Sequence, residues 1–568
     1  MGVTKLWEVI DPAKRSYTLE EISADRANRD NRHQLFIAID IALWTYQANS
    51  SKGGKRPQLR LIFYRFCRLF ELGIRAVFVF DGPNRPTFKR DREISTIPAN
   101  SEFRRTVIAL AKLFNFFVWH ANGEAEAECA ALERLGFVDM VMTGDVDAFL
   151  FGAKRLIRQW PTKRHSPVPC YDMAWITDTT GLDRSDMILI ALLRGSDYHH
   201  GGERVGIRVA EGLARCKKHL PLMEAVQRAK QDQSNVEEDA IESLSQQLIE
   251  DLQYELAHGS QGHLSMQYSQ IDLDDGHFPD RRILDDFVHP ETRIANTTTR
   301  DLEQWINSEN SVDLAEIAHF CKVVFEWPPK YLVRRFQNLL FHAYLNQHLR
   351  NLASTPSDAV AEPMSSQQKR RKKSESSSSS SQQTYIQSQI GSFFGVSKGG
   401  YNDRSIMSSQ PKPDILHIRN QKVLGNVLLY HVDFDLHLLD DFTATITSKL
   451  EHADEKYAQL LDPECASQGM DDTNGANGVE EEQEDQGDTI EPEKLCRKWM
   501  LADLVAMAFP TMVSKFKQTV SSKPKSTPKK PTRKKSPKDK GKGVQTKLTD
   551  YIIPKTTASD TVVVLDDD

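Results

Sequence analysis

The sequence predicts an α/β fold with a mostly parallel sheet and helices on both faces. Four short apolar runs in the first third of the chain have the unbroken, β-branched and aromatic character of strands buried on both faces, and helical patterns separate them. These runs occupy residues 35–40, 76–81, 116–120 and 138–145. Three of them end in aspartate. Because ligands of such sheets bind beyond the carboxyl ends of the strands, acidic side chains are expected at a binding site.

Length and composition indicate several folded parts joined by linkers. A chain of 568 residues is too long for one compact domain. The net charge of -6 combines an acidic run at 471–493 with a basic segment at 523–547, so it hides two blocks of opposite sign. The seven cysteines include no CxxC pair, which indicates a reduced compartment without a zinc site or a disulfide framework. Without an apolar span or a signal peptide, we expect a soluble intracellular protein.

The first 350 residues are predicted to form one main folded part with an insertion. Residues 1–219 form its core, and within them 183–219 indicate a helix, a glycine-rich turn and a second helix. Residues 220–350 are predicted to combine a partly disordered insertion with a helical completion of the core. The polar stretch 228–300 is the insertion of low order, and amphipathic helical spacing resumes at 299–349.

The remainder of the chain is predicted to hold a small second unit between disordered segments. Residues 351–411 are rich in serine and basic residues, as expected of a disordered linker. Residues 412–517 predict an α+β module: 414–435 alternate like paired strands, 495–516 favour helix around a proline, and the acidic run loops out between them. Residues 518–568 form a basic disordered tail.

Seven carboxylates make up the candidate site. They stand in the contexts AID, FDG, GEAEAE, TGDVDAF and GSDY, and are Asp40, Asp81, Glu124, Glu126, Asp145, Asp147 and Asp197. Like charges a few ångströms apart disfavour mutual ionisation, so such a cluster requires cations. Oxygen ligands without interleaved His or Cys favour Mg²⁺ or Mn²⁺ over zinc. Two such ions, about 4 Å apart, activate a water and stabilise both oxygens of an in-line phosphodiester displacement.

Each acid taken alone has a structural alternative. An aspartate at the end of a strand is often only a helix cap or a turn residue. The coincidence of strand-terminal aspartates with glycine-flanked acidic pairs at one edge of the sheet favours the two-metal phosphoryl-transfer site. Helical spacing offers a competing pair, because Glu124 and Glu128 are i, i+4 neighbours.

The same motifs, in this order, resemble those of the flap endonuclease superfamily. The resemblance begins at MGVTKLWEVI and is dense over residues 1–215. It implies a PIN-like nuclease core, DNA phosphodiester hydrolysis with two Mg²⁺ ions that Mn²⁺ replaces, and a metal-binding role for all seven acids. It also pairs Glu124 with Glu126, which requires Glu124 at a helix start and leaves Glu128 as a supporting residue or a surface charge.

The interval between two of the acids indicates one branch of that superfamily. Flap endonucleases carry a helical arch between the acids that match Asp81 and Glu124, but only 43 positions separate these residues here. A short interval leaves the cleft open to a continuous strand, and therefore resembles the Holliday-junction-resolving branch. Members of that branch carry a chromodomain after the nuclease core. The 412–517 unit resembles one, with a helix that includes Trp499; the alternative is an unrelated α+β module.

Glycine-rich and basic segments are the candidate DNA contacts. The turn at 201–206 matches the family's helix-turn-helix, which holds duplex DNA by its phosphates with a monovalent cation such as K⁺; the alternative is a simple helix hairpin. The candidates at the N-terminus, in two basic loops and around this turn are Gly2, Lys52, Lys55, Arg56, Lys89, Arg90, Arg92, Gly202, Arg204, Gly206 and Arg208. Phosphate contacts provide affinity without sequence reading. Trp44 and Tyr46 either stack on an unpaired base or pack in the core.

Short segments of the linker and tail predict import and regulation. The basic runs at 369–373 and 529–535 resemble nuclear import signals. Thr527 and Ser536 precede proline and match cyclin-dependent kinase sites, and phosphate charge there weakens binding of import receptors and DNA. We therefore expect a nuclear protein regulated through the cell cycle between nucleus and cytoplasm; the alternative is an unregulated solvated linker.

Two further segments predict protein partners. Residues 387–394 have the spacing of a sliding-clamp-binding box, with Gln387, Ile390, Phe393 and Phe394 as its determinants, and 545–552 are a looser copy. The terminal run Val562, Val563, Val564 and Leu565, followed by aspartates, resembles a SUMO-interacting motif that adds a strand to a partner's sheet.

Together these features predict a metal-dependent, structure-specific DNA endonuclease. Its expected substrates are Holliday junctions, 5′ flaps and replication forks in recombination and repair. Two copies are expected on one junction, because a four-way junction has near-twofold symmetry. Three alternatives stand beside this prediction: a 5′-flap endonuclease or exonuclease that does not resolve junctions, a catalytically dead DNA-binding scaffold, and a small-molecule phosphohydrolase.

Overall fold

The computed structural model describes most of the first 354 residues and the C-terminal module. The described residues are 2–29, 34–85, 88–89, 92–93, 101–229, 235–259, 263–264, 268, 270–273, 278–294, 299–308, 312–354, 413–424, 427–451, 455–461 and 491–522. Met1–Phe516 form one compact unit and Lys517–Asp568 a second. Outside the described residues lie the predicted linker from 355 onward, the acidic run up to residue 490, the tail from 523 onward, and the clamp, SUMO, import and kinase motifs. The first five residues of the predicted disordered tail, 518–522, are helical instead, as the end of a helix that begins at Pro510.

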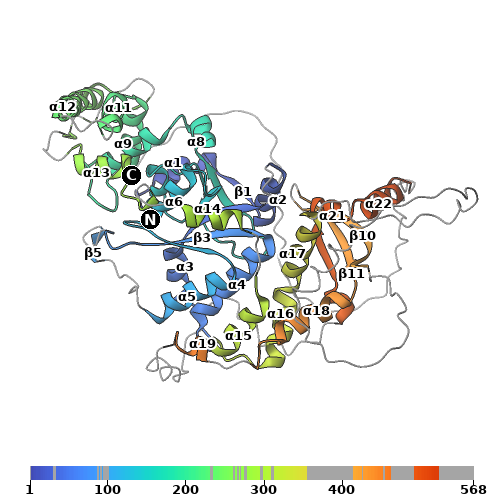
Figure 1. The fold of residues 1–568 in the computed structure, drawn as a ribbon. Helices are drawn as coiled ribbons and strands as arrows, with labels where there is room; N and C mark the ends of the chain where they lie inside the picture. Colours follow the sequence, from blue (N-terminus) through green and yellow to red (C-terminus); the bar gives the residue numbers. More distant parts are fainter. Residues whose placement is uncertain are drawn as a thin grey trace, which may run out of the picture. The chain divides into compact units, whose positions relative to one another are not determined.

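A seven-stranded mixed sheet forms the centre of the fold (Figure 1). Its order is β1-β9-β8-β7-β2-β3-β6. Strands β8, β7, β2, β3 and β6 are parallel to one another, and β9 pairs antiparallel with both β8 and the edge strand β1. The strands are β1 (Arg15–Tyr17), β2 (Leu35–Asp40), β3 (Ile74–Phe80), β6 (Phe117–His120), β7 (Met140–Met142), β8 (Arg155–Ile157) and β9 (Val168–Asp172). All four predicted strands are present and parallel. The other three were missed because they are short and have no continuous apolar run.

Alternate residues of the central strands enter two separate cores. Ile37 and Ile39 of β2 pack on one face, and Phe36 and Ala38 pack on the other. One face is covered by α3 (Ile41–Ala48), α4 (Pro57–Leu72), α5 (Glu102–Leu113), α15 (Leu314–Val324), α16 (Pro329–Leu339) and α17 (Phe341–Ser354). The other is covered by α1 (Leu6–Ile10), α6 (Ala125–Arg134), α7 (Asp147–Leu150), α8 (Met173–Thr180), α9 (Arg184–Arg194), α10 (Ile207–Arg215) and α14 (Arg300–Asn307). Helices therefore cover both faces, as predicted.

The polar stretch expected to be of low order contains regular helices. These are α12 (Asn235–His258) and α13 (Arg281–Val288), which follow α11 (Leu220–Ala229). Leu248, Leu252 and Leu256 of α12 are buried in the same core as α11. The prediction of low order is wrong for these helices, because their apolar residues recur at a helical spacing of four within a sequence whose average polarity hides them.

The C-terminal module is a three-stranded antiparallel sheet with helices. Strands β10 (Ile415–Leu424) and β11 (Val427–Phe434) confirm the predicted strand pair, and β12 (Arg497–Leu501) lies beside β11. The prediction of a helix over 497–501 is wrong, because pairing with β11 draws this segment into the sheet; the helix α21 (Ala502–Ala508) begins after it. The remaining helices are α18 (His437–Thr447), α19 (Glu455–Ala458), α20 (Pro492–Leu495) and α22 (Pro510–Ser522).

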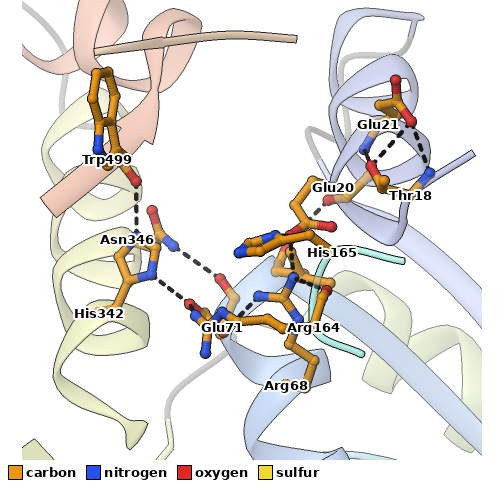
Figure 2. A network of polar contacts seen from close by, with 12 residues as sticks. Thr18, Glu20, Glu21, Arg68, Glu71, Arg164, His165, His342, Asn346 and Trp499 are labelled. Carbon is orange, nitrogen blue, oxygen red and sulfur yellow. Dashed lines mark hydrogen bonds and ion pairs between the residues drawn. The ribbon is translucent and has the colours of Figure 1, made fainter. Parts of the chain in front are cut away.

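A buried polar network joins this module to the core around the main sheet (Figure 2). The carboxylate of Glu71 on α4, 3% exposed, accepts hydrogen bonds from Arg68 (2.7 Å) and Arg164 and contacts Nδ1 of His342. Nε2 of His342 on α17 donates to the carbonyl oxygen of Trp499 in β12 (3.1 Å). Burial opposes ionisation of Glu71, but the bond to His342 and the surrounding positive charges outweigh it and hold the pKa of Glu71 well below its usual range.

Two further predictions concern cysteines and membranes. Six of the seven cysteines lie in the described part of the chain, none of them in a disulfide, and five are buried, as expected of small apolar side chains in a core. Within the same residues, no helix is both long and apolar enough to span a bilayer.

Candidate active site

The seven predicted acids lie beyond the carboxyl ends of the parallel strands. Asp40 is the last residue of β2, Asp81 directly follows β3, and Asp145 lies three residues after β7. Asp81 is half-buried, and the other six are buried: Asp40, Glu124, Glu126, Asp145, Asp147 and Asp197. Carboxylates are rarely buried without partners, so this concentration marks the site.

Asp40 ties the end of β2 to the end of β7. Its Oδ1 accepts from the backbone N–H of Ala42 (2.8 Å) and caps α3, while its Oδ2 accepts from the hydroxyl of Thr143 (3.2 Å). Burial raises the pKa of Asp40 to about 7, and the charges of Asp81 and Asp145 add to this. Three strand ends thus bring their acids close enough to repel one another.

A close approach of two loops places Asp81 against the start of α6. The N–H of Gly82 donates to the carbonyl oxygen of Gly123 (2.8 Å), and a Cβ at Gly82 would lie 2.1 Å from a carbonyl oxygen of the facing loop. Only glycine fits there. The Oδ1 of Asp81 then accepts from the N–H of Ala125 (3.0 Å). Glu124 is the residue before the first turn of α6, as the pairing with Glu126 required.

Glu128, the competing partner, has a different role. It is fully buried and accepts hydrogen bonds from the indole N–H of Trp119 (2.9 Å) and the backbone N–H groups of Arg293 (2.7 Å) and Ile294 (2.8 Å). The expectation of a surface charge is therefore wrong for Glu128: it holds the 291–294 segment against α6. Sequence spacing could not show this, because its partners lie up to 166 positions away.

Asp145 and Asp147 are held by backbone groups, including those of the N-terminus. The Oδ1 of Asp145 accepts from the N–H of Asp147 (3.1 Å), and the Oδ1 of Asp147 accepts from the N–H of Val3 (3.0 Å). A Cβ at Gly2, whose φ is +78°, would lie 2.2 Å from an oxygen of either aspartate. Gly2, predicted as a DNA contact, thus lies directly on two acids of the cluster.

Asp197 completes the cluster from the turn after α9. Its neighbour Tyr198 donates its hydroxyl to Oε2 of Glu124. Burial raises the pKa of Asp147 well above its usual range. The negative charges of Asp145, Asp197 and Glu124 raise the pKa further. Tyr198 was not singled out by sequence reasoning, although its position next to Asp197 was the available signal.

The donor set suits a hard divalent cation, but the described conformation is not a preformed cage. Among the residues that the structure describes, no three His, Cys, Asp or Glu side chains are arranged to hold a metal ion as they stand. Arg85 forms an ion pair with Asp81, and Tyr198 engages Glu124, so protein donors occupy these two carboxylates. The clustered oxygens and the raised pKa of Asp40 fit a cation that relieves their repulsion.

Both halves of this cluster fall in regions shared with known proteins. Residues 1–96 match the XPG N-terminal domain, and residues 115–197 match the XPG I-region. The two matches contain all seven acids. The chain belongs to the XPG-like flap endonuclease superfamily.

Two of the similar proteins are GEN-like flap endonucleases. Flap endonuclease GEN-like 1 of Arabidopsis thaliana is 36% identical over 202 residues, which are 31% of this chain and 34% of that protein. Flap endonuclease GEN homolog 1 of Mus musculus is 31% identical over 220 residues, 35% of this chain and 23% of that protein. The chain thus spans about a quarter to a third of the length of these relatives.

A solved structure has a similar fold. It is a crystal structure of the Holliday junction-resolving enzyme GEN1 in complex with product DNA and Mg²⁺. The likeness has a TM-score of 0.59 at 22% identity and covers 92% of this chain and 100% of that one.

The segment that carries an arch in other superfamily members is short here. The two-residue strands β4 (Phe88–Lys89) and β5 (Arg92–Glu93) form an antiparallel pair, and α5 then packs into the core. The connection between Asp81 and α5 therefore comprises only residues 82–101. The side chains of Lys89 and Arg92, predicted DNA contacts, lie outside the described part, and their role stays a prediction.

The predicted DNA contacts after the first acid differ in their surroundings. Arg56 donates to Oε1 of Glu102 (3.0 Å) and to the carbonyl oxygen of Val324 (2.9 Å), so it links α4, α5 and α15 inside the fold. Lys55 is exposed and pairs with Glu326 (3.1 Å). Lys55 stays a candidate phosphate contact, whereas the geometry gives Arg56 a structural role.

The predicted helix, glycine-rich turn and second helix are present. Helices α9 and α10 pack together and are joined by the glycine-rich turn. Gly202 is half-buried, whereas Arg204 and Arg208 are exposed on the turn and the first turn of α10. Gly206 precedes α10, and a Cβ there would meet no atom within 4 Å. The open helix start suits a phosphate.

Trp44 and Tyr46 were each expected either to pack in the core or to stack on an unpaired base, and their exposures differ. Trp44 is 1% exposed, with its ring centroid 4.8 Å from that of Trp160 and 5.6 Å from that of Phe78. It packs in the core. Tyr46 is 76% exposed and stays a candidate for stacking on a base.

Proposed function

We propose that this protein is a metal-dependent, structure-specific DNA endonuclease that cleaves Holliday junctions and 5′ flaps in DNA recombination and repair. The observation that carries the proposal is the cluster of seven carboxylates at the carboxyl ends of the parallel strands. The short connection of residues 82–101 between Asp81 and α5 adds to it. The GEN-like relatives and the GEN1 structure with product DNA and Mg²⁺ support it.

The chain's own residues prepare this chemistry. The seven acids would hold two Mg²⁺ ions, or Mn²⁺ in their place, which would supply an activated water and stabilise the attacking and leaving oxygens. Gly2 leaves room for the N-terminal backbone to hold Asp147 through Val3. Arg85 and Tyr198 would have to release Asp81 and Glu124 before these carboxylates could bind the ions.

The substrate and its other contacts follow from the same proposal. Two copies act on one junction, each making one nick, because the junction is nearly twofold symmetric. The turn before α10 holds duplex phosphates with K⁺, with Arg204 and Arg208 adding charge. The module at 412–517 acts as a chromodomain-like accessory that contacts DNA.

The segments outside the described residues add a proposed cellular setting. Nuclear import signals and kinase sites place the protein in the nucleus under cell-cycle control, and the short motifs recruit a sliding clamp and SUMO. Titration of linker and tail peptides against both proteins, with the Phe393→Ala, Phe394→Ala pair and the Val563→Ala, Leu565→Ala pair as controls, tests this. Binding that ignores these substitutions counts against the motifs.

Substitution of single acids tests the activity itself. With Mg²⁺ and labelled junctions, Asp145→Asn and Glu124→Gln should abolish cleavage while junction binding survives or tightens, because fewer anions then face the phosphates. Chelation by EDTA should abolish cleavage too. A matched control is Lys330→Gln, an exposed side chain on α16.

The outcomes separate the proposal from its alternatives. Near-normal turnover by either acid variant would show that the two-metal assignment is wrong. Cleavage of flaps but not of intact junctions would restrict the protein to flap chemistry. Junction binding without any metal-dependent cleavage by the wild type would identify a DNA-binding scaffold.

A further inference from the structure

Three basic side chains lie together at the carboxyl end of β6, next to the acid cluster. Nη2 of Arg104, in the first turn of α5, lies 3.0 Å from Nδ1 of His120, the last residue of β6. Nη1 of Arg293 donates to the carbonyl oxygen of His120 (3.3 Å). A guanidinium can only donate, so Nδ1 of His120 accepts the bond from Arg104. The two arginines therefore flank one histidine.

Aromatic faces hold both guanidinium groups. The Cζ of Arg104 lies 4.7 Å from the ring centroid of Phe80, and the Cζ of Arg293 lies 4.8 Å from that of Trp119. Both rings are buried, and they stand at the ends of neighbouring strands β3 and β6. Stacking on a fixed ring orients a guanidinium without using its hydrogen-bond donors. The cluster is thus ordered before any ligand arrives.

The cluster has donors to spare and no carboxylate within ion-pair distance. In the part of the chain that the structure describes, neither Arg104 nor Arg293 forms an ion pair, and each is half-buried. An arginine side chain carries five N–H donors. Arg104 and Arg293 each use one of these donors in the contacts with His120 given above. Burial lowers the pKa of His120, and the positive charges of Arg104, Arg293 and Lys112 lower it further. His120 therefore lies among positive charges.

The neighbourhood of this cluster indicates what it binds. His120 ends β6 and Asp81 follows β3, the parallel strand paired with β6, so the basic cluster and the acids lie at the same edge of the sheet. The charge of Asp81 acts on Arg104. A DNA strand that brings one phosphate to those acids is repelled by them at its neighbouring phosphates. Guanidinium groups match phosphate oxygens in geometry and in charge.

We propose that Arg104, His120 and Arg293 form a phosphate-binding site that holds the backbone of the cleaved strand beside the scissile phosphate. This inference rests on the proposed nuclease function and deepens it by naming where that strand lies. The ligand is a backbone phosphodiester, and the contact is independent of base sequence.

Salt dependence of junction binding tests the site. The full-length variants Arg104→Gln, Arg293→Gln and the double variant are compared with Lys330→Gln, which removes an exposed charge on α16. Binding is measured in EDTA, so that no strand is cut, over a range of NaCl concentrations. Each lost phosphate contact should lower the slope of log affinity against log salt by about 0.7–0.9 and weaken binding about tenfold. The double variant should lose about twice as much slope, and Lys330→Gln should match the wild type.

A second measurement separates phosphate binding from a structural role. Arg104→Lys keeps the charge and should keep most of the salt slope. Junctions with one neutral methylphosphonate, moved along the strand next to the cut, should reveal one position at which Arg104→Gln has no further effect. Thermal unfolding of every variant checks that the fold is intact.

The results that overturn the site differ from those that overturn the nuclease proposal. If Arg104→Gln and Arg293→Gln keep the wild-type salt slope, or if no methylphosphonate position is coupled to Arg104, the site does not bind phosphate. Cleavage by the wild type in Mg²⁺ then still supports the nuclease proposal. If the two glutamine variants lower the salt slope but the wild type cuts no DNA in Mg²⁺, the phosphate site is supported and the nuclease proposal is wrong.

Discussion

Replacing Glu71 by glutamine should loosen the joint between the core around the main sheet and the C-terminal sheet while leaving the acid cluster intact. The carboxylate of Glu71 contacts Arg68, Arg164 and His342, and His342 in turn contacts β12 through the carbonyl oxygen of Trp499 (Figure 2). Glutamine keeps the shape of the side chain but removes its charge and one acceptor. Three cationic or hydrogen-bonding groups then face a neutral amide.

The size of the effect follows from burial. The side chain of Glu71 is 3% exposed, so solvent hardly screens its interactions. Removing one partner of a buried ion pair costs about 3–5 kcal/mol, and the retained amide oxygen reduces this to about 2–4 kcal/mol. In a folded unit of several hundred residues, 1 kcal/mol shifts the midpoint of thermal unfolding by about 2 °C or less. Glu71→Gln should therefore lower the Tm by about 2–6 °C.

The Tm difference between wild type and Glu71→Gln should also depend on pH, in a direction that the pKa of Glu71 fixes. The pKa of Glu71 lies below its ordinary value of 4.5. A carboxyl with a depressed folded pKa contributes stability that is fully present above the unfolded pKa and is lost as the pH falls through the folded pKa. The difference in Tm between wild type and Glu71→Gln should thus be constant above about pH 5.5 and narrow as the pH falls below 4.5.

Scanning calorimetry at pH 4, 5 and 6 measures both features. The matched control is Glu326→Gln, which removes an exposed carboxylate paired with Lys55 and should cost less than about 1 kcal/mol. An unchanged Tm in Glu71→Gln, or a difference that widens on acidification, would refute this account of the network.

Further substitutions test three separate features. Gly2→Ala should reduce cleavage strongly, because its Cβ would meet two catalytic carboxylates, whereas Gly136→Ala, also at positive φ but in open space, should cost only about 1 kcal/mol and leave cleavage intact. Trp44→Ala should cost about 3–5 kcal/mol in thermal unfolding, and Tyr46→Ala should leave stability within about 0.5 kcal/mol but weaken binding to unpaired DNA. Glu128→Gln should cost about 1–3 kcal/mol, because an amide nitrogen then faces backbone N–H donors; a wild-type Tm would contradict its role.

Much of the fold and of the acid cluster was predictable, because the signals are local. The apolar run at 35–40 is strand β2 residue for residue, and its final aspartate is the first acid of the site. Parallel strands end at one edge of a sheet, so strand ends alone predicted that Asp40, Asp81 and Asp145 meet. The glycine-rich turn between two helices was equally local.

Other features depended on partners that are distant along the chain. Residues 497–501 have a sequence that suits a helix, but β11 pairs with them and makes them a strand. Glu128 stands at helical spacing from Glu124, but backbone donors more than 160 positions away fix its role. In the sequence, Arg56 is one of several basic residues in a loop. Its structural role depends on hydrogen bonds to α5 and α15, which the sequence could not show.

The sequence by itself therefore determined four parallel strands at the centre of the sheet, the identity of the acids and the chemistry that they suit. Spacing and composition encode these directly, because side-chain period and strand-end position are set within a few residues. The tertiary structure alone decided which basic side chains lie near one another and near the acids. It brought Arg104 and Arg293 to either side of His120 and placed Arg85 on Asp81, because the potential at a site sums over groups near in space and regardless of their separation along the chain.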